Sequence, residues 1–145
     1  MISCDTNVLF PALCPELPFH ETAAALLESF RNDRSFVLCE QTLLETYCLC
    51  RNPAVLAKPL SAPEAVAVIN ALRSNPKWRI VDVPPRGRAM RKTWEAAAAP
   101  GFPARRVFDL RMAWTLIENG IDTFYTRNTK DFADCGFANL VNPFE

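Results

Sequence analysis

The sequence predicts an α/β protein, a three-layer α/β/α sandwich with a central, mainly parallel sheet. Three observations lead to this fold class. Short apolar runs alternate with longer segments whose apolar residues recur at helical spacing. The alternation continues without a linker, repeat or low-complexity segment. The chain has 145 residues, half of them hydrophobic, which suits one core. We therefore expect a single domain over residues 1–145.

The first fifty residues are predicted to contain two strands and two helices. Residues 2–5 form a short apolar strand. Residues 19–32 place alanine, leucine and phenylalanine on one helical face. Residues 35–39 form a second apolar strand, and 41–51 form a helix. That helix ends ahead of Pro53, because proline disfavours helix in the residue before it.

The middle of the chain begins with a capping signal. Ser61 and Glu64 have the spacing of a capping box and precede a run of Ala, Val and Ile, which predicts a helix. Asn75-Pro76 ends this helix. Residues 79–83 read as a strand closed by two prolines, and residues 87–98 as a helix.

The last third of the chain repeats the alternation. Residues 108–119 form a strongly amphipathic helix, and Gly120 is placed as its C-cap. Residues 122–126 form a strand, and residues 139–141 form a short last one. Strands separated by helices in this way favour parallel pairing.

Composition excludes several classes of protein. Sixteen basic and sixteen acidic residues give a net charge of zero, which argues against a strongly basic nucleic-acid binder. No run approaches the ~20 apolar residues of a membrane span. The N-terminus lacks the pattern of a signal peptide, so we expect a cytoplasmic protein that does not enter a membrane.

The six cysteines do not form a recognisable metal or disulfide pattern. No Cys-x-x-Cys occurs, and His20 is the only histidine, so we do not expect a zinc site. Most of the cysteines lie in apolar strand or helix patterns. We expect reduced, mostly buried thiols.

Asp5 stands at the end of an apolar strand, where a carboxylate is unusual. Either Asp5 caps the next helix, or it is held at the strand end for chemistry. Thr126 ends another predicted strand. Ligand sites of parallel sheets lie at the carboxyl ends of the strands, so we expect Asp5 and Thr126 to share one cleft.

Two further acids lie on helices in apolar surroundings. Glu45 is followed three and four positions later by Cys48 and Leu49, so it either reaches water at the boundary or needs a partner in the interior. Asp109 heads the apolar stripe of its helix. Asp109 is either an acid of the first turn that is stabilised by the helix dipole, or part of a functional site.

Polar residues also follow the strand that ends near Thr126. Asn128 and Asp131 belong to the segment "TRNTKDF", which is either ordinary turn chemistry or part of a pocket. Several carboxylates with almost no histidine suggest a hard oxygen-ligand site for Mg²⁺ or Mn²⁺. A divalent ion would remove the repulsion between the acids and serve phosphoryl chemistry.

In order and spacing, four segments of the chain resemble a PIN domain, the metal-dependent ribonuclease fold of VapC-type toxins. The segments are "CDTNVLF", "LLETYCLCRNP", "VFDLRMAWTLIENGIDTFYT" and "TRNTKDF". The resemblance runs from residue 2 to about residue 143, and it implies a sheet with helices on both faces and an acidic pocket at the carboxyl edge.

The resemblance also implies roles for individual residues. Asp5, Glu45 and Asp109 would be the catalytic acids that bind the metal. Asn7 would orient Asp5, with Thr126 and Asn128 completing the pocket. Many family members carry a fourth acid near the position of Asn128, and Asp131 would take its place directly or through water.

The function that follows is a metal-dependent endoribonuclease, a hydrolase of RNA phosphodiester bonds that leaves 5′-phosphate and 3′-hydroxyl ends. It would be the homodimeric toxin of a toxin-antitoxin pair, silenced by an antitoxin protein. The basic residues available to hold the RNA backbone are Arg86, Arg88, Arg91, Lys92, Arg105 and Arg106. These basic residues form either a phosphate-contacting patch or a solvated helix face. Trp94 either stacks on a base or belongs to the core.

Three other functions compete with the nuclease. A non-catalytic RNA-binding or interaction module of the same fold is favoured by the neutral Asn128. A phosphatase of the haloacid-dehalogenase type needs a second Asp two residues after the first, where this chain has Asn7. A receiver domain needs a phospho-accepting Asp, for which Asp82 is a weak candidate.

Overall fold

The computed structural model describes residues 1–145 and contains five strands and seven helices. The strands are β1 (Ile2–Cys4), β2 (Val37–Cys39), β3 (Arg79–Val81), β4 (Thr123–Tyr125) and β5 (Asn139–Val141). The helices are α1 (Thr6–Leu13), α2 (His20–Ser29), α3 (Glu40–Cys50), α4 (Ala62–Arg73), α5 (Arg88–Ala97), α6 (Arg106–Glu118) and α7 (Thr129–Phe132). No helix is both long and apolar enough to cross a membrane.

All strand pairings are parallel, as the sequence predicts. β1, β4 and β5 form one sheet in the order β1-β4-β5, and β2 pairs with β3. A parallel bridge between Ile2 and Phe36 joins the two groups, and the Ile2 amide donates to the Ser35 carbonyl at 2.9 Å. The combined order is therefore β3-β2-β1-β4-β5, and the carboxyl ends of all five strands lie at one edge.

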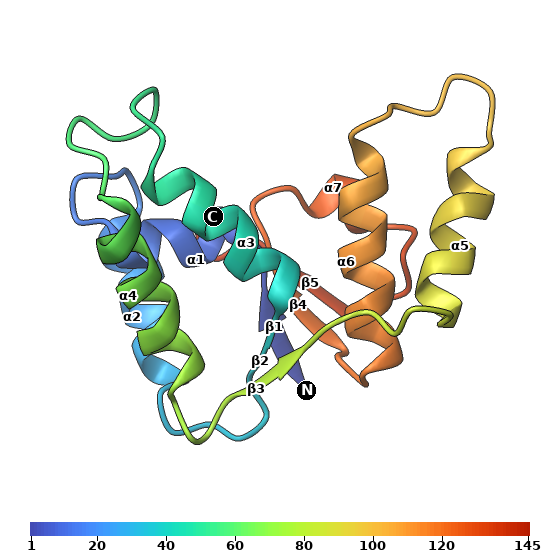
Figure 1. The fold of residues 1–145 in the computed structure, drawn as a ribbon. Coiled ribbons are helices and arrows are strands. Elements are labelled where there is room, and N and C mark those ends of the chain that lie inside the picture. The colour runs from blue at the N-terminus through green and yellow to red at the C-terminus, as the bar shows by residue number, and fades with distance from the viewer.

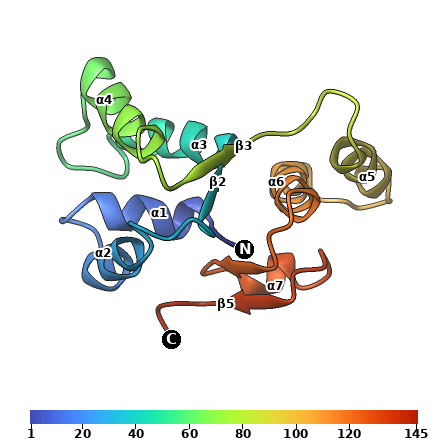
Figure 2. The ribbon, with the colours of Figure 1, turned by 90° about the horizontal axis from the view of Figure 1, so that it is seen from below.

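Separate hydrophobic cores cover the two faces of the sheet. Phe36 and Leu38 pack with residues of α1 and α3, whereas Val37 and Cys39, which alternate with them, pack against α6. Successive side chains of a strand point to opposite faces, so this division gives a helical layer on each side. Figures 1 and 2 show the result: α1 to α4 gather on one side of the strands, and α5 and α6 on the other. The predicted three-layer α/β/α fold is confirmed.

Helix ends explain how the chain reaches the sheet edge. Ser61 caps α4 by accepting a hydrogen bond from the Glu64 amide, as the capping box predicts. Gly120 follows the end of α6 with a φ of 82°, which favours glycine. The Gly120 and Ile121 amides donate to the carbonyls of Ile117 and Leu116, which forms a Schellman motif. This turn directs the chain into β4.

Two helices differ from the sequence-based expectation. α1 was not predicted, because eight residues with Pro11 among them show no convincing helical period. It forms because Val8, Leu9 and Phe10 are all buried there, so packing outweighs the missing backbone donor of the proline. α7 is a single turn of four residues, which is too short for periodicity to reveal.

The six cysteines are unpaired in the structure. Four of them are buried, namely Cys4, Cys39, Cys50 and Cys135. Burial is the main reason that the pKa of each of these four thiols is raised. A thiol that resists ionisation packs as a small apolar side chain.

Candidate active site

Asp5 occupies the first position after β1 and caps the helix that follows, which is one of the two roles that the sequence left open. Its Oδ1 accepts the Thr6 amide at 2.7 Å, so the side chain caps α1. Its Oδ2 faces β4, where it accepts the Thr126 hydroxyl at 2.8 Å and the Asn7 amide nitrogen Nδ2 at 2.9 Å. Cys4 and Tyr125 are partners in the parallel register, so the following residues of the two strands meet. The predicted proximity of Asp5 and Thr126 is confirmed.

A set of hydrogen bonds fixes the direction of the Thr126 hydroxyl. The backbone amide of Asn128 donates to Thr126 Oγ1 at 3.0 Å, so the hydroxyl proton is free to point at Asp5. Asn7 Oδ1 accepts the Arg127 amide at 3.1 Å, which orients the Asn7 side-chain nitrogen toward Asp5. The side chain of Asn128 itself is exposed at the start of α7 and makes no capping bond.

Glu45 on α3 is held by two residues that sequence reasoning missed. Thr6 Oγ1 donates to Glu45 Oε2 at 2.6 Å, and Gln41 Nε2 donates to Glu45 Oε1 at 3.1 Å. Two features of the sequence could have indicated them. Gln41 lies one helical turn before Glu45, and Thr6 directly follows Asp5. Together they tie Glu45 to α1 and to its own helix.

The orientation of the Gln41 amide follows from its other partners. Gln41 Oε1 accepts from Arg111 at 2.9 Å, and its Nε2 also donates to the Phe108 carbonyl at 2.8 Å. Arginine can only donate and a carbonyl can only accept, so the amide cannot be reversed without losing these bonds. Gln41 is 6% exposed, and its other partners direct the donor group at Glu45.

The remaining acids meet Glu45 in an open pocket of about 450 Å³. Asp109 from the first turn of α6 and Asp131 from α7 line it with Glu45. Pro103, Phe108, Arg105 and Arg106 complete the wall. Acids that lie far apart in the sequence thus gather in one pocket. The helices that carry them, α3, α6 and α7, are labelled in Figure 1.

Negative charge and burial act together on these acids. Burial raises the pKa of the Asp5 carboxyl to about 6, and the charges of Glu45 and Asp109 add to the rise, although bonds from Thr126 and Thr6 oppose it. Burial also raises the pKa of Asp109, and Glu45 and Asp131 contribute. These acids are close enough to disfavour one another's ionisation, a penalty that a cation would remove.

The donor set suits a hard divalent ion in its chemistry. Carboxylates with neighbouring hydroxyl and amide oxygens are the ligands that Mg²⁺ and Mn²⁺ prefer. No group of three or more acidic, histidine or cysteine side chains is arranged as a ready-made metal site. The acids form an open array with room for water and a phosphate group.

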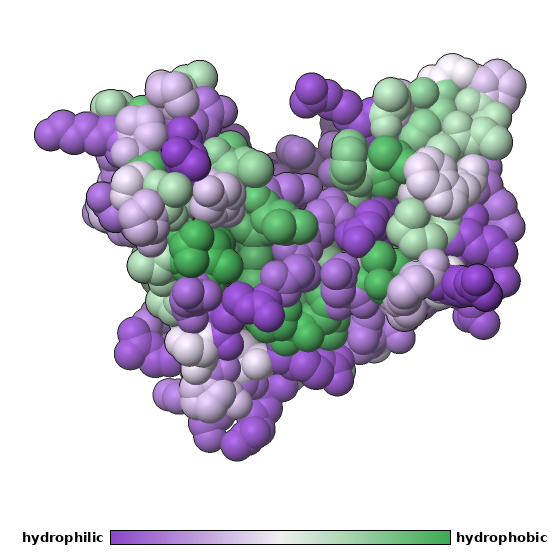
Figure 3. Space-filling model, in the orientation of Figure 1, coloured by the Kyte–Doolittle hydropathy of each residue, from purple (hydrophilic) through white to green (hydrophobic).

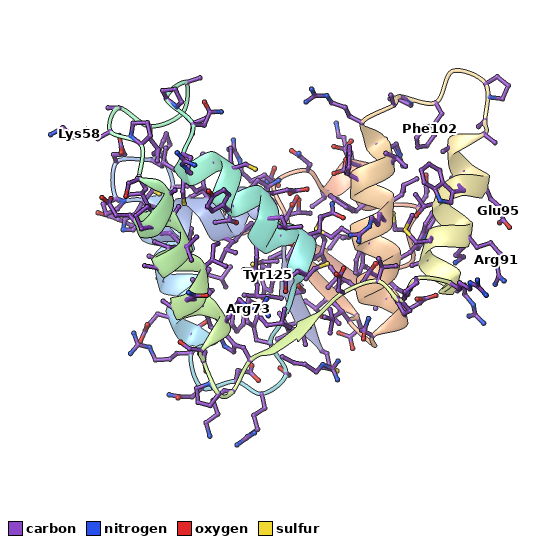
Figure 4. The ribbon with its side chains drawn as sticks, viewed as in Figure 1. Lys58, Arg73, Arg91, Glu95, Phe102 and Tyr125 are labelled. Carbon is purple, nitrogen blue, oxygen red and sulfur yellow. The ribbon has the colours of Figure 1, made fainter.

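The predicted basic patch is not continuous. Arg105 and Arg106 line the acidic pocket, whereas Arg88 and Lys92 line a different pocket farther along the α5–α6 pair. Figure 4 shows Arg91 pointing outward from α5, and Arg86 is also exposed. α5 and α6 pack side by side with the loop between them, so neighbours in the sequence are carried to different ends.

Trp94 lies on the same helix and is 62% exposed. It therefore does not belong to the core, which was one of the two expectations for it.

Figure 3 shows the molecular surface hollowed between the two groups of helices, where the acids lie at the carboxyl edge of the sheet.

Comparison with known proteins places the chain in a family. No family model matches it. Ribonuclease VapC24 from two strains of Mycobacterium tuberculosis, CDC 1551 and H37Rv, is 40% identical over 143 residues, which is 99% of this chain and 97% of the relative. The crystal structure of M. tuberculosis VapC20, a sarcin-ricin loop cleaving toxin, matches with a TM-score of 0.68 over 92% of this chain and 94% of that one, at 17% identity. The fold agrees with VapC20, and the identity to VapC24 over nearly the whole length shows that this chain belongs to the VapC family of PIN-domain toxin ribonucleases.

Proposed function

We propose that the protein hydrolyses RNA internally with a divalent cation, Mg²⁺ or Mn²⁺, held by Asp5, Glu45 and Asp109. One observation carries this assignment: acids from the end of β1 and from α3, α6 and α7 converge at one sheet edge, where burial and mutual charge raise the pKa of Asp5 and Asp109. Such an arrangement is costly for stability alone and is explained by a cation.

The bound cation would supply positive charge to the scissile phosphate and a water of lowered pKa. The protein's own residues prepare the site for it. Thr126 and Asn7 hold the Asp5 carboxylate, while Thr6 and Gln41 hold both oxygens of Glu45. Such supporting hydrogen bonds orient ligands and are part of metal affinity.

The rim of the pocket supplies the remaining groups. Asp131 acts as the fourth acid, directly or through water, in place of the neutral Asn128. Arg105 and Arg106 contact RNA phosphates, since their positive charges lie beside the acids. The attacking water displaces the 3′ oxygen of the ribose, so the products carry 5′-phosphate and 3′-hydroxyl ends.

The family also suggests the setting in which the enzyme acts. We propose that the protein is a cytoplasmic homodimer held inactive by an antitoxin protein. Light scattering of the purified chain tests the dimer. Co-expression with a small protein encoded beside its gene, followed by co-purification and loss of nuclease activity, tests the antitoxin.

Cleavage of a labelled, mixed-sequence RNA tests the assignment. The wild type is compared with Glu45→Gln and with Glu95→Gln, each with Mg²⁺, with Mn²⁺ and with EDTA. Glu95 is a matched control because it is exposed and points outward from α5 (Figure 4). We expect metal-dependent cutting by the wild type and Glu95→Gln only. An active Glu45→Gln protein would refute the role of this acid.

A second candidate is a non-catalytic RNA-binding module of the same fold. The neutral, exposed Asn128 favours it, because many family members carry an acid near this position. This alternative predicts that RNA binds equally well in EDTA and is cleaved with neither metal. Binding measured by fluorescence anisotropy in the same samples separates the two functions.

A further inference from the structure

An arginine and two phenylalanines form a stacked cluster outside the acidic pocket. The Arg127 guanidinium lies 4.8 Å from the centre of the Phe19 ring and 6.0 Å from that of Phe144. The two rings are 4.7 Å apart with an interplanar angle of 35°. We call these three residues the Arg127 clamp. They come from the start of α2, the turn after β4 and the segment after β5, so the fold has brought them together.

The conformation of Phe19 is unusual. Its φ is 67°, and it is the only residue other than glycine with a positive φ. A side chain in the left-handed region costs about 1–2 kcal/mol. The Phe19 ring is nevertheless 43% exposed, so the core gains little from it. Strain combined with an exposed aromatic ring is typical of a binding position.

The charge of Arg127 is available to a ligand. Arg127 is exposed and has no acidic partner among the ion pairs of the structure. The aromatic faces hold the guanidinium in place without neutralising it. Its positive charge lies in the segment that also binds Asp5, on the other side of the acids from Arg105 and Arg106.

The clamp is connected to the acids through short, rigid contacts. The Arg127 amide donates to Asn7 Oδ1, and Asn7 Nδ2 donates to Asp5 Oδ2. Thr126, which precedes Arg127, also binds Asp5. The backbone of Arg127 is thus held at a fixed position relative to Asp5, through the side chain of Asn7 and through the adjoining Thr126.

The clamp and the pocket arginines lie on different sides of the acids. Phe19 belongs to the α2 side of the sheet, and Arg105 and Arg106 belong to the α6 side (Figures 1 and 2). A single RNA strand that crosses the carboxyl edge would therefore meet a cation on each side of the scissile phosphate.

We infer that the Arg127 clamp is an RNA subsite, in which Phe19 stacks on a nucleobase next to the cleaved bond and Arg127 binds the adjoining phosphate. Unpaired bases stack readily on aromatic rings and guanidinium planes, and this recognition requires a single-stranded segment. The subsite deepens the proposed function and rests on it. It assigns base contacts to a surface that supplies none of the metal-binding acids.

Phe19→Gly is the decisive variant, because glycine adopts the positive φ without strain and removes only the ring. Base stacking of ~1–3 kcal/mol corresponds to a change of about 5- to 150-fold. We expect KM for RNA to rise at least about fivefold while kcat stays within about twofold. Phe19→Tyr, which keeps a stacking ring, should restore the wild-type KM. Arg127→Met should reduce the slope of log KM against log salt by the amount that corresponds to the loss of about one phosphate contact.

Substrates with a single missing base show whether the ring contacts a base directly. With the wild type, removing one base beside the cleavage position should raise KM as much as Phe19→Gly does. With Phe19→Gly, removing that base should have no further effect. An unchanged KM for Phe19→Gly, or equal sensitivity of both proteins to the missing base, would overturn the subsite.

The test distinguishes failure of the clamp from failure of the proposed function. Metal-dependent cleavage by the wild type tests the function, and only the variants test the clamp. If the wild type cleaves no RNA, the same RNAs are used in binding measurements by anisotropy. A Kd that Phe19→Gly and Arg127→Met leave unchanged would then overturn the clamp as well.

Discussion

The buried charge of Asp5 makes a quantitative prediction about stability. The pKa of Asp5 rises from 3.8 to about 6, chiefly through burial. Between these values the unfolded chain releases the proton that the folded protein retains. The free energy of unfolding of the metal-free protein therefore falls as pH rises from about 4 to about 6, and then stays low. The difference between the two pKa values corresponds to about 3 kcal/mol.

The variant Asp5→Asn removes this pH dependence. At pH 4 a neutral carboxyl and an amide are both uncharged and each pair a carbonyl acceptor with a donor group, so the two proteins should be about equally stable. At pH 7 only the wild type carries the buried charge, so Asp5→Asn should be more stable by about 3 kcal/mol. Comparing the two proteins at each pH cancels most of the contribution of Asp109, whose pKa is raised in the same direction.

Urea unfolding in EDTA, followed by tryptophan fluorescence from pH 4 to pH 7.5, measures the difference. Equal m-values confirm that both proteins unfold from similarly compact states. Adding Mg²⁺ or Mn²⁺ at pH 7.5 should stabilise the wild type and not the variant, because a ligand of the folded state raises its stability. The reasoning is refuted if Asp5→Asn is less stable than the wild type at pH 7 or if the difference does not change with pH.

Three further substitutions test the account. Gln41→Leu removes the hydrogen bond that Glu45 Oε1 accepts. We expect kcat and Mn²⁺ affinity each to fall about 10- to 100-fold, with an unchanged circular dichroism spectrum. Ser61→Ala removes the cap of α4 and should cost about 1 kcal/mol in urea unfolding, with RNA cleavage unaffected. Leu116→Ala opens a hole in the core beneath α6 and should cost about 2–5 kcal/mol, also measured in urea. Each expectation is contradicted by one result: full activity of Gln41→Leu, loss of RNA cleavage by Ser61→Ala, or wild-type stability of Leu116→Ala.

The meeting of Asp5 with Thr126 was predictable, because carboxyl ends of parallel strands share an edge whatever the details of packing. The gathering of Glu45, Asp109 and Asp131 followed from resemblance to a family and not from spacing alone. Their pocket is formed by three helices whose mutual placement no local pattern determines.

The supporting contacts could not be predicted for the same reason. Thr6 reaches Glu45 only because α1 packs against α3, and α1 itself was hidden by Pro11. The separation of the basic residues could not be predicted either, because α5 and α6 carry them to different pockets. The Arg127 clamp depends on three distant segments and on one positive φ, neither of which leaves a periodic signal.

The central claim, that RNA cleavage requires a cation held by these acids, is tested most directly by titrating Mn²⁺ into metal-free protein. Free Mn²⁺ is followed by electron paramagnetic resonance while the cleavage rate of labelled RNA is measured in the same samples. The wild type is compared with Asp109→Asn and with Asp134→Asn, an exposed acid outside the acidic pocket. We predict that the rate rises in proportion to bound Mn²⁺ in the wild type and Asp134→Asn, and that Asp109→Asn loses both binding and cleavage. Cleavage at full rate in EDTA, or an Asp109→Asn protein that binds Mn²⁺ and cleaves like the wild type, would contradict the claim.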